Sequence, residues 1–213
     1  MIGMIGKDDI MVVAESESGA KGKKKFRAKS LAAELAYLAI GVAICTVCAW
    51  ITIPVGVIPV TMQTFAVAAV GALLGAKRGT IAVAVYLLMG LIGIPVFSGF
   101  NAGVPALMGA TGGYLIGFIF DVFIVGLFSN LPVKNKIAKT AVTYAAMVLG
   151  LAFCYFFGTL WFITVFNRGS ANPVGIASAL SMCVVPYLLP DAAKLLLASV
   201  LGVRLRGFIK VRK

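Results

Sequence analysis

The chain has 213 residues, of which 61% are hydrophobic and 12% are charged, and its formal net charge is +12. Its mean hydropathy of +1.04 is too high for a soluble domain, and several apolar runs are long enough to cross a bilayer. The basic residues lie in clusters between or beyond these runs, which argues against nucleic-acid binding as the reason for the positive charge. We therefore expect an integral membrane protein.

The N-terminal segment differs from the rest of the chain. Residues 1–30 contain the basic stretch GAKGKKKFRAK and lack an apolar core, so they do not resemble a cleaved signal peptide. We expect them to form a disordered basic extension. Residues 31–213 are expected to form one membrane domain that ends in a basic tail, residues 204–213.

Six apolar stretches follow in order, and they predict an all-α membrane protein with six transmembrane helices. The expected spans are residues 31–53, 60–76, 80–96, 108–128, 141–166 and 174–203. We expect Pro- and Gly-containing loops at 53–61 and 97–107. The sixth span is expected to break near Pro186 and Pro190, because proline removes a helical hydrogen bond.

The distribution of Lys and Arg predicts the orientation. The N-terminal segment holds seven, the loop after the second span two, the loop after the fourth span three, and the tail five. The 1–2 and 3–4 loops hold none, and the 5–6 loop holds only Arg168. By the positive-inside rule, both termini are expected to be cytoplasmic.

Asp191 and Lys194 break this pattern, because they lie within the last apolar stretch, VVPYLLPDAAKLLLA. Charges inside a membrane span are costly and usually mark a functional site. We expect Pro190 and Asp191 in the first turn of a helix, with Lys194 three residues on and on the same face. A carboxylate beside an ammonium suits a ligand with both N–H donors and an anion. An internal pair that only neutralises itself is the alternative.

Other polar and aromatic residues fall on the same expected side of the membrane. These are Gln63, Asn101, Thr111, Tyr155 and Trp161. A polar cluster with aromatic walls is typical of a small-molecule site. An interfacial aromatic belt explains Trp161 equally well. Asp121, in the middle of the fourth span, has two open interpretations: a proton site or a neutral, hydrogen-bonded structural residue.

Small residues at helical spacing mark the first span, at Ala32, Ala36, Ala39 and Ala43. Such a strip lets another helix approach closely, either within the protein or from a partner.

The remaining sequence carries no signature of catalysis. His is absent, and the four cysteines lie in apolar stretches, so we expect neither a metal site nor a structural disulfide. No Walker A, GxSxG or HExxH motif occurs, so we expect neither an enzyme nor a cofactor.

Five motifs in order resemble the BioY family, the biotin-binding S components of energy-coupling factor transporters. The motifs are PVTMQTF (59–65), GxxLGxxxG (71–79), YLLMGLIGIPVFSG (86–99), GATGGYLIGF (109–118) and PYLLPDAAK (186–194). The resemblance covers residues 26–207. The usual PFxxGDxxK pattern has Pro190 here in place of glycine, and the long basic N-terminus is not part of the family pattern.

The resemblance implies a plasma-membrane protein with six helices that captures biotin from outside. Its partners would be a transmembrane coupling subunit and two ATPases, with the first-helix alanines contacting the coupling subunit. Asp191 would accept the ureido N–H groups of biotin. Lys194 could pair with the ligand carboxylate, with a carbonyl or with Asp191. Asn101, Gln63 and Thr111 could complete the polar contacts, and Tyr155 and Trp161 could cover the ring.

Two other function classes compete with this reading. The first is an ion- or proton-coupled carrier that acts alone, with Asp121 and Asp191 as proton sites. The second is a membrane enzyme, for which Asp191 and Lys194 alone make a poor catalytic set.

Overall fold

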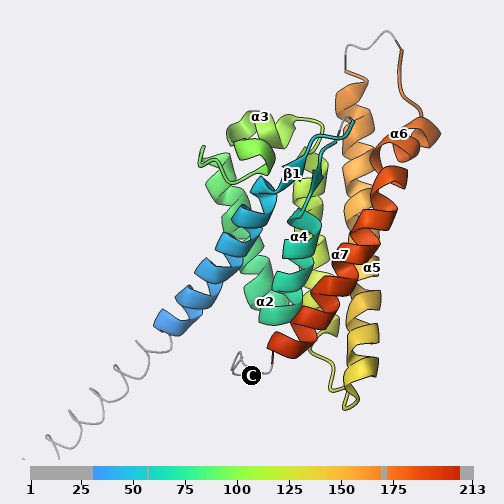
Figure 1. Cartoon of the computed structure of the whole chain (residues 1–213). Helices are drawn as coiled ribbons and strands as arrows, with labels where there is room; N and C mark the ends of the chain where they lie inside the picture. Colours follow the sequence, from blue (N-terminus) through green and yellow to red (C-terminus); the bar gives the residue numbers. More distant parts are fainter. Residues whose placement is uncertain (1–30, 57, 169–171, 207–213) are drawn as a thin grey trace, which may run out of the picture. The chain divides into compact units, whose positions relative to one another are not determined.

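The computed structural model describes residues 31–56, 58–168 and 172–206. The predicted N-terminal extension and the end of the basic tail lie outside these residues. The chain divides into two compact units, Met1–Tyr37 and Leu38–Lys213. Of the first unit, only residues 31–37 are described, and they are helical. The second unit is predominantly helical, as predicted (Figure 1).

A two-stranded sheet and a series of helices follow in chain order. They are the helix Leu31–Trp50, β1 (Thr52–Ile53), β2 (Val60–Thr61), α2 (Gln63–Leu91), the 3-10 helix η1 (Ser98–Phe100), α3 (Gly103–Met108), α4 (Gly112–Phe128), α5 (Lys136–Phe166), α6 (Ile176–Cys183) and α7 (Val185–Leu205). β1 and β2 are antiparallel, with Thr52 opposite Thr61. In the described residues, three helices are long and apolar enough to cross a membrane, or four if the bent pair α6–α7 is one span.

The helix α2 is folded back on itself at Gly75. This residue has φ 78° and ψ 177°, a conformation that glycine adopts more readily than any other residue. In a straight helix, Gln63 and Tyr86 would lie about 35 Å apart. Instead, the Gln63 Nε2 donates to the Tyr86 hydroxyl at 2.8 Å. The element therefore consists of two antiparallel segments, 63–74 and 76–91, which correspond to the second and third expected spans.

Close helix packing at glycines holds the second unit together. A Cβ on Gly126 of α4 would lie 2.3 Å from the backbone nitrogen of Ala76, so α4 touches the turn of α2 directly. Gly117 packs in the same way against Cys154 of α5. A buried apolar cluster that includes Ala68, Val125 and Leu195 fills the space between α2, α4, α5 and α7. This cluster forms a rigid base for the more polar end of the bundle.

Several elements differ from the prediction. The first helix ends at Trp50, α2 ends at Leu91 and α4 begins at Gly112, each a few residues from the expected bound. The expected loop 97–107 contains η1 and α3. Helix α5 begins at Lys136, earlier than expected, because the Asn135 side chain accepts from the Ile137 N–H at 2.8 Å and caps it. The break in the last span lies at Val184 rather than at a proline, and α6 and α7 are bent by 43° there.

Replacing Gly126 by alanine should destabilise the fold, because a backbone atom cannot move aside as a flexible side chain can. Overpacking of this kind costs roughly 1–3 kcal/mol or more. Gly175→Ala is the matched control, since nothing lies within 4 Å of its added Cβ. Thermal denaturation in detergent should show a lower Tm for Gly126→Ala alone. Equal Tm values for the two variants would contradict the close contact between α4 and α2.

Candidate ligand-binding site

A cavity of about 390 Å³ is lined by residues of β2, α2, α4, α5, α7 and the segment 98–109, which includes α3. The label of α3 marks this end of the bundle in Figure 1. This volume is within the range of small-molecule sites. Apolar side chains such as Phe118 and Leu151 line part of the wall. The lining residues that carry a hydroxyl, an amide or a charge are Thr61, Gln63, Thr64, Ser98, Asn101, Thr111, Tyr114, Tyr155, Tyr187, Asp191 and Lys194.

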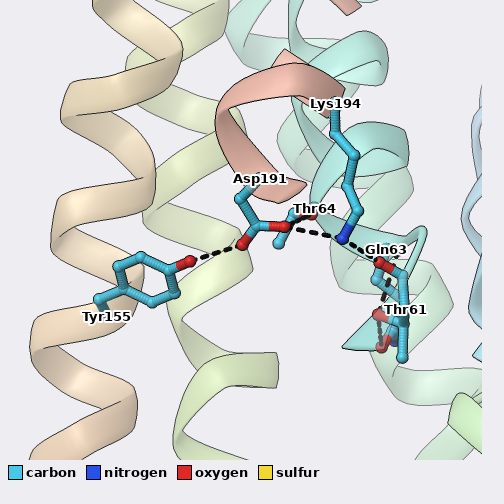
Figure 2. Close-up of polar contacts among 6 residues, drawn as sticks. All are labelled: Thr61, Gln63, Thr64, Tyr155, Asp191 and Lys194. Carbon is cyan, nitrogen blue, oxygen red and sulfur yellow. Dashed lines mark hydrogen bonds and ion pairs between the residues drawn. The ribbon is translucent and has the colours of Figure 1, made fainter. Parts of the chain in front are cut away.

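Asp191 is at the centre of the polar network (Figure 2). Its Oδ1 accepts from the Lys194 ammonium at 2.7 Å and from the Thr64 hydroxyl at 3.0 Å. Its Oδ2 accepts from the Tyr155 hydroxyl at 2.5 Å. The residue is only 3% exposed. A carboxylate offers about four acceptor positions, so one position on Asp191 remains for a ligand donor.

Lys194 is held between two acceptors. Its ammonium donates to Asp191 Oδ1 and to the Thr61 carbonyl, each at 2.7 Å. An ammonium has three N–H donors, so one remains without an acceptor in the described part of the chain. The site therefore keeps one acceptor position, on Asp191 Oδ2, and one donor position, on Lys194. These positions suit a ligand that carries both an N–H donor and an acceptor.

The start of α7 differs from the sequence prediction. The helix begins at Val185, with Pro186 in its first turn, whereas Pro190 and Asp191 lie in the second turn. The prediction that Asp191 lies in the first turn was therefore wrong, and the helix dipole contributes less there than expected. The i,i+3 spacing does place Asp191 and Lys194 on one face, as their ion pair shows.

Gln63 lines the cavity, and its amide is partly engaged. Its Nε2 donates to the Tyr86 hydroxyl at 2.8 Å, and its Oε1 accepts from the Thr61 hydroxyl at 3.1 Å. Since the Thr61 carbonyl holds Lys194, Gln63 also positions the ammonium indirectly. Tyr86 is fully buried, and its place at the start of the YLLMGLIGIPVFSG motif was the available signal.

The other predicted residues have different positions. Asn101 and Thr111 line the cavity, and the Asn101 amide donates to the Ser98 carbonyl at 2.7 Å. Trp161 does not line it. Its indole N–H donates to the Gly109 carbonyl at 3.0 Å, which fastens the link between α3 and α4. All of the predicted ligand-binding residues except Trp161 therefore line the cavity.

Two further tyrosines, Tyr187 and Tyr114, line the cavity. The Tyr187 hydroxyl donates to the carbonyls of Val55 and Ile58, and thus holds the connection between β1 and β2. The Tyr114 hydroxyl lies 3.3 Å from the Thr159 hydroxyl. Tyr187 lies in the PYLLPD motif, so its place in that motif was the available signal.

Asp121 lies outside the network. It is fully buried, and neither of its carboxyl oxygens has a hydrogen-bond partner in the described residues. It packs on Gly150 of α5, where a Cβ would lie 2.3 Å from Oδ1. It does not line the cavity. Among the described residues, no group of three or more His, Cys, Asp or Glu could hold a metal ion.

Comparison with known proteins gives one consistent family. The chain is 39% identical over 164 residues to the "Biotin transporter BioY" of Thermotoga maritima, which covers 77% of this chain and 90% of that protein. It is 34% identical over 176 residues to the "Probable biotin transporter BioY" of Pyrococcus horikoshii, covering 83% and 98%.

A solved structure also matches. It is described as a crystal structure of the S-component for biotin from an ECF-type ABC transporter. The TM-score is 0.72 at 28% sequence identity, and the match covers 84% of this chain and 93% of the other.

The model of the BioY family matches residues 20–210. The match begins at residue 20, six residues before the start of the resemblance, and includes the basic stretch KGKKK (21–25). Because the model covers nearly the whole chain, and relatives above 30% identity are covered over most of their length, the chain belongs to the BioY family.

Proposed function

We propose that this protein is the substrate-capture component of an ECF-type transporter, and that it binds biotin from outside the cell. Family membership and the likeness to a biotin S-component support a role in transport rather than in catalysis. Transport would require assembly with a transmembrane coupling subunit and two ATPase subunits, since the chain itself has no Walker A motif.

The observation that carries the proposal is the Asp191–Lys194 pair in the cavity wall, which keeps one acceptor and one donor position without a partner in the described residues. Biotin has a cyclic urea with two N–H donors and a carbonyl, an apolar thioether ring and a carboxylate. Asp191 would accept a ureido N–H at its remaining position. The remaining Lys194 donor would reach the ureido carbonyl or the carboxylate. A pair that only neutralised itself would need neither these positions nor an adjoining cavity.

The rest of the wall can serve the remaining parts of the ligand. Asn101 and Thr111 would supply further polar contacts, and Tyr155 would pack against the ring while holding Asp191. Gln63 would position Thr61 through its carbonyl oxygen, and its second N–H remains for the ligand. Trp161, expected to cover the ring, would instead support the wall through Gly109.

We also propose six membrane-spanning segments with both termini on the cytoplasmic side of the plasma membrane. The fold-back of α2 supports the number, because it yields two segments where one helix is assigned. The alternation of basic and uncharged loops supports the orientation. Segment 63–74 is only about 18 Å long, so it reaches across part of a typical 30 Å hydrocarbon core.

The first helix has the surface that a coupling subunit would need. Gly41, Cys45 and Ala49 are buried, whereas Ala39 and Ala43 are exposed. Ala32 and Ala36, in the unit that ends at Tyr37, are exposed as well. An exposed strip of alanines gives a neighbouring helix close access to the backbone. We assign this strip, Ala32, Ala36, Ala39 and Ala43, to the coupling subunit.

A carrier that acts alone, with Asp121 as a proton site, is the second candidate, because both carboxyl oxygens of Asp121 lack partners in the described residues. Uptake into vesicles with and without the ATPase subunits separates the two. Uptake that needs no ATPase, but needs a pH gradient, would favour the carrier.

Orientation can be tested with single cysteines at exposed loop positions. Pro132→Cys, before α5, should react with a membrane-impermeant maleimide only after the cells are opened. Gly175→Cys, before α6, should react on intact cells, because the α5–α6 connection is expected to face outward. The unmodified chain is the background control, since its four cysteines are buried or half-buried. The reverse labelling pattern would invert the proposed topology.

The alanine strip should matter for assembly and not for capture. Ala43→Trp places a large ring on the exposed face and should block close helix approach. Copurification with the coupling subunit should be lost while the isolated variant still binds biotin. Ile116→Trp, at an exposed position of α4 that does not line the cavity, controls for bulk away from the strip. Loss of binding together with assembly would assign the strip to internal packing.

Asp191 should carry ligand recognition. A hydrogen bond to a charged group contributes about 1.5–3 kcal/mol, and Asp191→Asn also leaves Lys194 without its ion-pair partner. We therefore expect biotin affinity to fall by about tenfold to a few hundredfold, measured by calorimetry on purified protein.

Asp121→Asn is the matched control for this substitution, because Asp121 is also a buried carboxylate but does not line the cavity. Its biotin affinity should stay near that of the unmodified chain. Unchanged affinity in Asp191→Asn would contradict the proposed role of the pair.

A further inference from the structure

One wall of the cavity is held in place by very few contacts. The segment 98–109 contributes Ser98, Asn101, Pro105 and other residues to the lining. No residue between Phe97 and Gly112 is buried. Segments with few buried contacts open at low free energy, and ligand-covering elements are drawn from them. This part of the wall is therefore suited to act as a lid.

The two ends of this segment are fastened. Phe97 is 2% exposed, and it packs on Gly90, where a Cβ would lie 2.0 Å from its ring. It also meets Tyr86 edge-on at 5.5 Å. At the other end, the Trp161 indole holds the Gly109 carbonyl at 3.0 Å. Movement would thus be confined to the residues in between.

Trp50, the last residue of the first helix, holds the middle of the segment. Its ring stacks on Phe100, with centroids 5.0 Å apart and planes 27° apart. Its indole N–H donates to the Pro95 carbonyl at 2.9 Å. Neither Trp50 nor Phe100 lines the cavity. Their contact fixes the segment to the first helix without touching the space for a ligand.

Phe100 has a backbone conformation that is unfavourable for a bulky residue, which indicates that its phenyl ring has a role at this position. Gly99 and Phe100 have φ values of 65° and 60°, and the Asn101 N–H donates to the Ser98 carbonyl at 3.3 Å. These are the features of a type I′ turn, whose central positions favour Gly, Asn and Asp. A bulky residue at positive φ is an outlier, and such strain gathers at ligand clamps and switch regions. Glycine at this position would give the same turn without strain, but it would lack the ring.

We propose that Trp50 and Phe100 form a latch that keeps the segment 98–109 closed over the cavity and slows both the binding and the release of ligand. The proposal rests on the proposed function, because biotin is the ligand used to observe it. Since the latch makes no contact with the cavity, its loss should speed both rates by a similar factor and leave Kd nearly unchanged.

The test uses the purified full-length chain loaded with labelled biotin and chased with unlabelled biotin. Phe100→Gly removes the ring and the backbone strain together, so its Tm should stay the same or rise. Loss of one aromatic stack should speed association and dissociation by about twofold to tenfold. Trp50→Phe keeps a ring and loses only the N–H donor, so it should speed both rates less. Trp50→Ala and Phe100→Gly each remove the same stack. The variant that combines them should therefore speed association and dissociation only slightly more than the faster of the two single variants.

Phe120→Ala is the matched control, because Phe120 and Phe157 form another exposed stack, with centroids 4.9 Å apart, away from this segment. It should leave both rates unchanged. Unchanged rates in Phe100→Gly, or a change in Kd through dissociation alone, would overturn the latch while the proposed function stands. Failure of the unmodified chain to bind biotin would overturn the proposed function, and the latch with it.

Discussion

The burial of Asp191 and Lys194 is the constraint on which the site depends. An ion pair removed from water is stable only when its remaining donors and acceptors are also satisfied. Here the partners come from three other elements: Thr61 from β2, Thr64 from α2 and Tyr155 from α5. The pair therefore fixes how α7 is placed against these elements. The pair itself keeps one acceptor position, on Asp191, and one donor position, on Lys194, for a ligand.

The central pair could be predicted from the sequence because charge in an apolar run is conspicuous, and i,i+3 spacing fixes a shared face whichever turn the residues occupy. The fold-back of α2 was predictable for a similar reason, since glycine and a basic pair interrupt two apolar runs near Gly75. The exact position of the break in the last span could not be predicted from the sequence. Proline is tolerated in the first turn of a helix, so Pro186 follows the break at Val184 instead of causing it.

Partners that lie far apart in the sequence could not be predicted. Thr64 and Asp191 are 127 positions apart, and only the packing of α2 against α7 brings them together. Trp161 illustrates the opposite error. Leu151, Cys154 and Tyr155 of α5 line the cavity, whereas Trp161, further along the same helix, bonds to the Gly109 carbonyl instead. The sequence indicates near which end of a helix a residue lies. The packing of neighbouring helices decides which face of the helix meets the cavity.

The first helix connects the two activities proposed for this protein. Its exposed alanines, Ala39 and Ala43, offer a surface to a partner, and its last residue, Trp50, fastens the segment that covers the cavity. A helix transmits displacement along its axis because its backbone hydrogen bonds keep it stiff. A partner that moved this helix would therefore act on the latch. Such a partner would change how fast biotin enters and leaves. Because the latch leaves the biotin Kd nearly unchanged, thermodynamic linkage then requires that biotin, acting through the latch, leave partner affinity nearly unchanged as well.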